Sequence, residues 1–172
     1  MTDVLRTARL VLRPLRLSDA DDICAGLQDW EVTRRLAMPP WPYRRTDAVA
    51  FVQGPVRIGA RGIDWQGRLV GVIAVDDSGE LGYWLARRAW GQGIATEAGR
   101  AMVDHAFTVG RRRVLNSGHQ ADNAASGRVL AKLGFEVTGQ EMCHYGPVGR
   151  FLPSVQLRLT ADRWKALRAL GE

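Results

Sequence analysis

The 172-residue sequence predicts one α/β domain in which helices pack against a mixed β-sheet. Leu69–Val75 is a continuous apolar run of the kind found in buried central strands. From Ile94 to Ala106 an apolar residue recurs every four positions, which predicts a helix with one apolar face. Val155–Leu159 alternates between apolar and polar residues, as a half-buried strand does.

The N-terminal part predicts a strand followed by a helix. Residues 9–15 are rich in leucine and valine and predict the first strand. Ser18 with Asp21 resembles a capping box, which marks the start of a helix. The apolar residues that follow recur at helical spacing, so the helix is expected to continue to Trp30.

A proline-rich loop separates this helix from a second helical segment. Three prolines between residues 39 and 42 cannot continue a helix. The same loop carries Trp41 and Tyr43, two aromatic residues that are unusual in a connector. They are candidates for lining a binding site, and packing in the core is the equal alternative. Residues 54–62 are rich in glycine and predict turns.

The middle of the chain predicts a β-hairpin. Gly67 marks a turn before the strand Leu69–Val75, and residues 76–79 (Asp-Asp-Ser-Gly) form the hairpin turn. Glu80–Ala86 is then the returning strand, and the helix that begins at Ile94 follows it.

The C-terminal part predicts three more strands and one more helix. Val114–His119 reads as a strand, and Asn123 starts a helix. Gly134 is expected to end that helix in the left-handed conformation. Phe135–Tyr145 and Val155–Leu159 are the last two strands. The predicted order is therefore β-α-α-β-β-β-α-β-α-β-β, without an internal repeat or a linker.

Composition and charge narrow the class of protein. No stretch approaches the roughly 20 apolar residues of a membrane span, and the first 15 residues lack the apolar segment of a signal peptide. Cys24 and Cys143 show no metal-ligand spacing. We therefore predict a cytoplasmic protein with free thiols, no metal and no membrane contact. The net charge of +6 is not concentrated in one run or interleaved with aromatic residues, so no specific nucleic-acid binding is expected.

Residues 88–93 (Arg-Ala-Trp-Gly-Gln-Gly) join a strand to a helix and have the form of an anion site. The first N–H groups of a helix lack intrahelical partners, and glycines let the backbone approach a phosphate closely. A dinucleotide fingerprint does not fit, because Thr96 stands where the third glycine would be. A Walker A loop does not fit either, because no Gly-Lys-Ser/Thr follows. A tight strand-to-helix turn without a ligand is the alternative interpretation.

In its context this turn resembles the GNAT superfamily, whose pyrophosphate loop matches Arg88, Gly91 and Gly93. Segments in the order and spacing of the RimJ/RimL branch, which includes ribosomal-protein N-terminal acetyltransferases, are Thr7–Pro14, Gly82–Leu85, Trp90–Ala98, Asp122–Ser126 and Leu130–Phe135. The resemblance implies a GNAT-like, mostly antiparallel central sheet flanked by helices, with splayed fourth and fifth strands. It also implies one N-acetyltransferase domain over residues 1–172 that transfers an acetyl group from acetyl-CoA to a primary amine.

The resemblance implies three groups of coenzyme-binding residues. The backbone at the strand end would bind the pantetheine arm, the glycine turn the pyrophosphate, and the second helix the sulfur and the 3′-phosphate. The residues at the strand end are Trp84, Leu85 and Ala86. Those of the glycine turn are Arg88, Gly91, Gln92, Gly93, Ile94, Ala95 and Thr96. Those of the second helix are Asn123, Ser126, Arg128 and Lys132. Solvated surface cations are the alternative for Arg128 and Lys132.

Acetyl transfer to an amine needs a proton acceptor, a donor for the oxyanion and a group that stabilises the leaving thiolate. The resemblance implies Glu80 as the catalytic base, with a surface carboxylate as the alternative. Ser126 is the candidate beside the sulfur. Many members of the family carry a tyrosine acid seven residues after the position of Asn123, but this chain has Leu130 there.

The acceptor side is less defined. Candidate acceptor-binding residues are Trp41, Tyr43, His119 and His144, whereas His105 reads as structural. The acceptor is expected to be a protein N-terminus or a small amine such as an amino acid or an antibiotic. A non-catalytic acyl-CoA-binding module is the alternative outside the enzymes, and the sequence also allows a homodimer.

Overall fold

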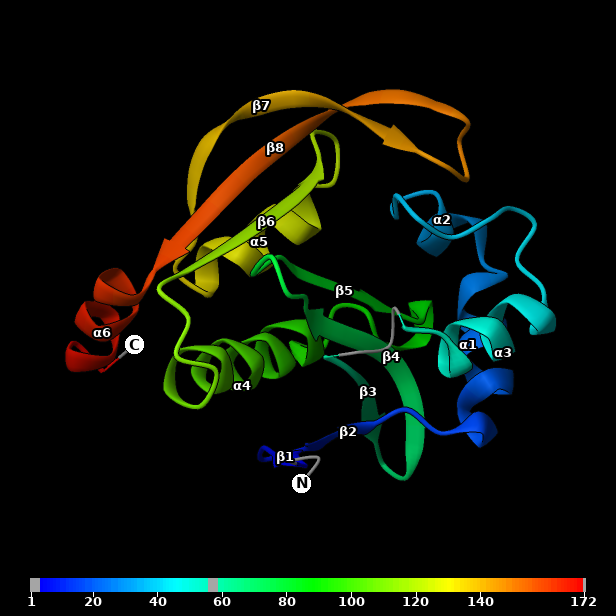
Figure 1. The fold of residues 1–172 in the computed structure, drawn as a ribbon, viewed down its shortest axis with the longest axis horizontal. Coiled ribbons are helices and arrows are strands. Elements are labelled where there is room, and N and C mark those ends of the chain that lie inside the picture. The colour runs from blue at the N-terminus through cyan, green and yellow to red at the C-terminus, as the bar shows by residue number, and fades with distance from the viewer. Residues whose placement is uncertain (1–3, 56–58, 172) are drawn as a thin grey trace.

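The computed structural model describes residues 4–55 and 59–171 and places their strands in two sheets (Figure 1). The first sheet is antiparallel throughout, in the order β1-β2-β3-β4-β5, and the second has the order β6-β8-β7. The strands are β1 Leu5–Arg6, β2 Leu10–Pro14, β3 Ala60–Trp65, β4 Arg68–Val75, β5 Leu81–Leu85, β6 Val114–Gln120, β7 Glu136–Tyr145 and β8 Arg150–Thr160. The α-helices are α1 Ala20–Leu27, α2 Trp30–Thr33, α3 Arg45–Gln53, α4 Ile94–Thr108, α5 Ala124–Lys132 and α6 Ala161–Ala169.

The predicted order of elements is confirmed by β2, α1, α3, β3, β4, β5, α4, β6, α5, β7 and β8. The short elements β1 and α2 and the C-terminal helix α6 were not predicted. Residues 54–62 were expected to be turns, but β3 already begins at Ala60, and residues 56–58 of this stretch lie outside the described residues. The pattern of β3 is concealed by an arginine, a glycine and an aspartate among its six residues, although Ile63 is fully buried.

Two local predictions about the first helix are wrong. Ser18 does not cap it; instead the Asp19 carboxylate accepts a hydrogen bond from the Arg16 N–H at 2.7 Å and forms the capping interaction of a preceding 3-10 turn. The helix also does not reach Trp30. It ends at Leu27, and Asp29 caps the separate helix α2 by accepting a hydrogen bond from the Glu31 N–H.

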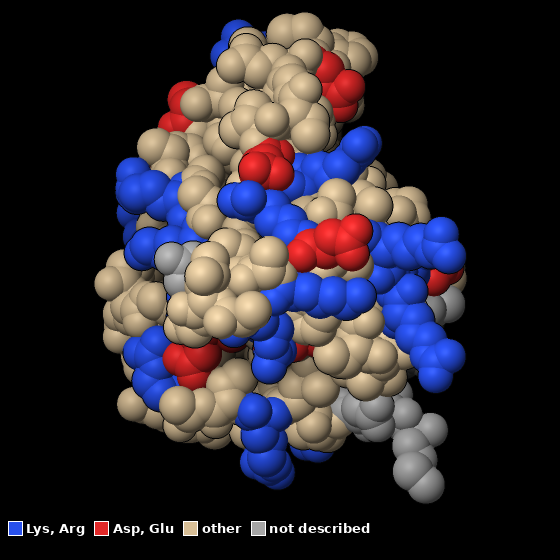
Figure 2. Space-filling model, turned by 90° about the vertical axis from the view of Figure 1, so that its left-hand side faces the viewer, with Lys and Arg blue, Asp and Glu red and all other residues tan. Residues whose placement is uncertain are grey.

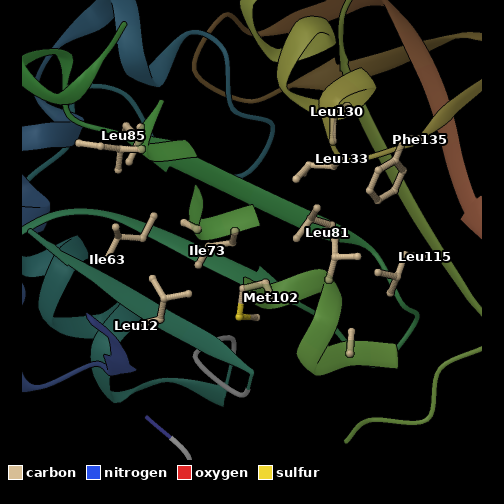
Figure 3. Close-up of a cluster of buried hydrophobic side chains, with 14 of the residues drawn as sticks. Leu12, Ile63, Ile73, Leu81, Leu85, Met102, Leu115, Leu130, Leu133 and Phe135 are labelled. Carbon is tan, nitrogen blue, oxygen red and sulfur yellow. The ribbon is translucent and has the colours of Figure 1, made fainter. Parts of the chain in front are cut away.

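Two hydrophobic clusters cover the two faces of the first sheet. The larger cluster lies between the sheet and the helices α4 and α5, and Figure 3 shows strand residues such as Leu12 and Ile73 beside Met102 of α4. The smaller cluster lies under α1 and α3 and includes Ile23 and Val72. Full burial of each such side chain contributes about 1.5–3 kcal/mol. The sheet is therefore held firmly from both sides.

The two sheets meet at β5 and β6, and these strands diverge. A single parallel bridge joins Glu80 to Asn116, and the Asn116 N–H donates to the Gly79 carbonyl at 3.0 Å. One residue further, the Ser117 hydroxyl donates to the Leu81 carbonyl at 2.8 Å. β6 pairs with β8 along its whole length, and beyond this point it turns away from β5 (Figure 1). The expected GNAT-like fold with splayed neighbouring strands is thereby confirmed.

Candidate functional site

The glycine turn ends at the N-terminus of α4 in a conformation that only glycine adopts readily. Gly91 and Gly93 have φ values of +71° and +75°, in the left-handed region. Gly93 is the N-cap residue, and the first helical hydrogen bond runs from the Glu97 N–H to its carbonyl at 3.0 Å. The N–H groups of Ile94, Ala95 and Thr96 therefore have no intrahelical acceptor and lie at the positive end of the helix dipole.

Three side chains of the turn donate hydrogen bonds to backbone carbonyls and so fix its shape. Arg88 donates from Nη2 to the Leu69 carbonyl at 2.7 Å, which ties the turn to β4. Gln92 donates from Nε2 to the Arg88 carbonyl at 3.0 Å. The Trp90 indole donates to the Leu85 carbonyl at 2.8 Å. In this structure Arg88 and Gln92 thus fix the shape of the turn through their side chains.

The turn opens onto a cavity of about 850 Å³. Its lining comes from the segment before β2, from α4 and from α5, and consists of Arg6, Thr7, Arg9, Gly93, Thr96, Glu97, Arg100, Ala101, Asp104 and Lys132. The cavity brings together Gly93, Thr96 and Lys132 from the predicted coenzyme site and adds Arg9 and Arg100. Lys132 and Arg100 are exposed, and Figure 2 shows that basic side chains outnumber acidic ones on one side of the molecule.

Glu97 connects α4 to the N-terminal segment. Its carboxylate accepts hydrogen bonds from the Thr7 hydroxyl at 2.6 Å, from the Arg9 N–H at 2.9 Å and from Arg9 Nε at 2.7 Å. Burial alone would raise the pKa of Glu97, but the bonds from Thr7 and Arg9 bring it below its ordinary value. Glu97 therefore stays ionised, and its charge is balanced by Arg9.

The hydrogen-bonding direction of β5 determines which backbone groups face the divergence. The Ala86 N–H donates to the Val70 carbonyl of β4 at 2.8 Å, so it is occupied. In an antiparallel pair alternate residues face the same neighbour, and Trp84, two residues earlier and opposite Val72, therefore also faces β4. Tyr83 and Leu85 present their N–H groups to the β6 side. Of the predicted strand residues, Leu85 is the one whose N–H faces the open edge.

Opposite faces of β5 carry different chemistry. Tyr83 faces α4 and α5, and its hydroxyl lies 2.8 Å from the Ser126 hydroxyl in the first turn of α5. Asn123 caps this helix by accepting a hydrogen bond from the Ser126 N–H at 3.3 Å. Trp84 packs on the other face, against the cluster under α1 and α3. The side chain of Glu80 and the position of Gly82 share that face with Trp84, because side chains alternate along a strand.

Glu80 lies near two groups of the second sheet. Burial raises the pKa of Glu80 although the residue is exposed overall, and the charges of Asp76 and Glu141 raise it further. Burial also raises the pKa of the Cys143 thiol, and the charges of Glu141 and Glu80 add to that effect. Among the described residues no lysine or arginine forms an ion pair with Glu80 or Glu141. Glu80 and Glu141 therefore give this part of the molecule negative charge, and the Cys143 thiol stays neutral beside them.

The predicted acceptor residues come from separate elements and have different surroundings. Tyr43 is buried in the smaller hydrophobic cluster, and this burial raises its pKa to about 12, so its role is in the core. Trp41 is 40% exposed and packs against Trp30, with 4.9 Å between ring centroids. His119 lies against Gly127 of α5 and hydrogen-bonds to the Gln120 carbonyl at 2.7 Å.

His144 lies on the face of its strand opposite to Glu141 and Cys143, the two residues near Glu80. It alternates with Cys143, so the two side chains lie on opposite faces of the β7–β8 hairpin. Its ring contacts Phe151 edge-on, with 5.3 Å between centroids. Arg128 is exposed on α5, as solvated cations are. The orientation of His144 could not be predicted from the sequence, because it depends on the twist and pairing of the second sheet.

Three features of the site were not predicted from the sequence: Tyr83, Glu141 and the Thr7–Arg9–Glu97 connection. Tyr83 lies in the segment Gly82–Leu85 that resembles the family, and side chains alternate along a strand, so its side chain could have been predicted to lie on the face opposite to Trp84. Glu141 approaches Glu80 only after the second sheet has folded.

Among the described residues no helix is long and apolar enough to cross a membrane, and no cluster of histidine, cysteine and acidic residues has metal-site geometry.

Comparison with known proteins gives the family. The chain matches the acetyltransferase (GNAT) domain over residues 9–136. It is 27% identical over 154 residues to the protein named uncharacterized N-acetyltransferase p20 of Bacillus licheniformis, covering 80% of this chain and 84% of that protein. It is 30% identical over 116 residues to the ribosomal-protein-serine acetyltransferase of Escherichia coli (strain K12), covering 60% and 65% of the two chains.

A solved structure agrees with the sequence comparisons. The ribosomal L7/L12 alpha-N-protein acetyltransferase RimL, solved in complex with coenzyme A, superposes with a TM-score of 0.79 at 21% identity, covering 94% of this chain and 99% of that one. The matched residues 9–136 include the glycine turn, β5, β6 and the start of α5. The chain therefore belongs to the GNAT acetyltransferase family.

Proposed function

We propose that this protein is an acetyl-CoA-dependent N-acetyltransferase that acts directly on a primary amine. The observation that carries the proposal is the divergence of β5 from β6, with the anion-binding turn of α4 on one face and the Glu80 carboxylate on the other. A thioester placed in the gap would be reached by the coenzyme-binding groups from one side and by an amine from the other.

The residues present fit coenzyme A. At Gly91 an added Cβ would meet no atom within 4 Å, and at Gly93 it would meet only Arg9 Nη2, at 3.5 Å, so the glycines leave open space above the N–H groups of Ile94, Ala95 and Thr96. These groups would hold the pyrophosphate, and Lys132 would lie toward the 3′-phosphate. The Leu85 N–H would bind the pantetheine arm. Asn123 would keep Ser126 in the first turn of α5, where its hydroxyl lies beside the sulfur.

The residues on the acceptor side suit an amine. An amine is mostly an ammonium ion at neutral pH, and the unpaired charges of Glu80 and Glu141 attract it. Glu80 takes one proton from the ammonium ion, so the neutral nitrogen can attack the acetyl carbonyl carbon, and the second proton leaves to solvent from the positively charged nitrogen that the attack creates. The carbonyl oxygen becomes an oxyanion, which an outward-facing N–H of β5 stabilises. The C–S bond then breaks, its electron pair stays on sulfur, and Ser126 stabilises the thiolate.

A protein N-terminus is our first choice of acceptor, because proteins that this chain resembles are named as acetyltransferases of ribosomal proteins. An N-terminal peptide can enter the cleft end first, with its amine directed at Glu80. A small amine, such as an amino acid or an antibiotic, is the second choice.

Two measurements test the proposal. Binding of acetyl-CoA should raise the melting temperature with ligand concentration, since a ligand at 100 times its Kd adds about 2.7 kcal/mol of stability. Release of free thiol should then appear with at least one member of a panel of N-terminal peptides and small amines. An unmoved melting temperature at millimolar acetyl-CoA contradicts the proposal. Binding without thiol release across the panel indicates a non-catalytic acyl-CoA-binding module instead.

A further inference from the structure

The hydroxyl groups of Tyr83 and Ser126 form a pair across the coenzyme face of the gap. Tyr83 projects from β5, Ser126 projects from α5, and their oxygens are 2.8 Å apart. Tyr83 packs against the large hydrophobic cluster, and burial raises the pKa of its phenol, an effect that the bond to Ser126 partly offsets. The phenol therefore keeps its proton at neutral pH.

The distance alone does not say which hydroxyl is the donor, but the surroundings do. Within the described part of the chain, Ser126 is the only hydrogen-bonding partner of the Tyr83 hydroxyl. The bond is part-buried, and an O–H that is shielded from water and donates to nothing is unfavourable. Leu130, one turn further along α5, is fully buried and supplies no polar atom. Tyr83 therefore donates its proton to the Ser126 oxygen.

We propose that this polarity makes Tyr83 a positioning residue that directs the Ser126 hydrogen toward the sulfur of the coenzyme. Because the Ser126 oxygen accepts from Tyr83, its own O–H is free to donate to another group. The role rests on the proposed function. As the C–S bond breaks, sulfur takes the electron pair, the Ser126 O–H donates a hydrogen bond to the thiolate, and after release the thiolate takes a proton from solvent. The ammonium ion loses two protons, one before and one after the attack, and the thiolate regains one, so each transfer releases one proton to solvent.

A titration of bound coenzyme A tests this inference without an amine acceptor. The ultraviolet absorbance of the thiolate is followed against pH in complexes of free coenzyme A with the wild-type protein and with variants. In the wild type the pKa of the bound thiol should lie below the ordinary thiol value of about 8.5. In Tyr83→Phe it should rise by about one pH unit, since a hydrogen bond to a charged group is worth about that much.

The chain supplies a matched control for this substitution. Tyr145 and Ser154 form a second pair of hydroxyl groups, also 2.8 Å apart but buried, within the β7–β8 hairpin. Tyr145→Phe removes the same kind of hydrogen bond, so it should lower the melting temperature comparably and leave the thiol pKa unchanged. Ser126→Ala should raise the thiol pKa as Tyr83→Phe does, the double variant should raise it no further, and Ser126→Thr should restore the wild-type value.

The outcomes separate the two proposals. An unchanged thiol pKa in Tyr83→Phe, with coenzyme A bound, overturns the role of Tyr83 and leaves the proposed function standing. A lowered thiol pKa that depends on Tyr83, in a protein that acetylates no amine in the panel, supports the role of the pair and counts against catalysis. A wild-type protein that does not bind coenzyme A overturns both.

Discussion

The two faces of β5 differ in how their chemistry is built. On the coenzyme face, Leu81 and Leu85 are buried and Tyr83 packs with them, so hydrophobic packing fixes the position of the reactive groups. On the acceptor face Gly82 supplies no side chain, and the charges around Glu80 come from a hairpin turn and from the second sheet. The coenzyme site therefore depends on local structure, whereas the acceptor site depends on how the two sheets meet.

The largest expected effect is on the coenzyme face. Gly93→Val places a β-branched residue at a φ of +75° and puts its side chain where the pyrophosphate would lie. We expect calorimetry to detect no acetyl-CoA binding and the fold to remain largely intact. Gly67→Val is the matched control, because Gly67 has a φ of +79° and open space around it, but lies in the β3–β4 turn. It should lose some stability and still bind. Unchanged affinity in Gly93→Val contradicts the assigned phosphate site.

The next effect is on the acceptor face. Glu80→Gln removes the proposed base, so the rate should fall by about 10²–10⁴-fold at neutral pH with little change in coenzyme Kd. Because the pKa of Glu80 is raised, the wild-type rate should decline with falling pH at a value above the ordinary glutamate pKa of about 4.3. The variant should lack this decline and should recover at high pH, where the amine deprotonates in solution.

Asp77→Asn controls for the loss of one negative charge, since Asp77 is exposed in the turn before Glu80. Its rate and pH dependence should match the wild type. If Glu80→Gln is fully active at neutral pH, the base is another group or a chain of water molecules.

The smallest effect should separate the two faces most sharply. At Gly82 an added Cβ would meet no atom within 4 Å, so a larger side chain fits the fold but fills the cleft beside Glu80. Gly82→Leu should raise the acceptor KM by about tenfold, equivalent to ~1.4 kcal/mol, and leave the coenzyme Kd unchanged. Weaker coenzyme binding with an unchanged acceptor KM would place Gly82 on the coenzyme side and contradict the assignment of the two faces of β5.

Local signals allowed much of the fold to be predicted from sequence. Asn123 is the N-cap of α5, and Gly134 follows that helix with a φ of +92°, as expected of a left-handed glycine. The missed helix α6 has no buried residue, so it lacks the apolar stripe that marks α4. The direction of His144 depends on the register of β7 against β8, which is interrupted by an irregularity between Val137 and Gly139.

The bonds between Glu97 and the N-terminal segment have a consequence for electrostatics. Glu97 stands in the first turn of α4, where an unbalanced carboxylate would repel an approaching phosphate. Thr7 donates a hydrogen bond to it and Arg9 supplies the counter-ion, so its charge is neutralised at the helix that receives the coenzyme. A chain shortened to begin after Arg9 would keep the glycine turn intact yet present the coenzyme with a bare negative charge. A purification tag is therefore better placed at the C-terminus, which lies apart from the N-terminus (Figure 1).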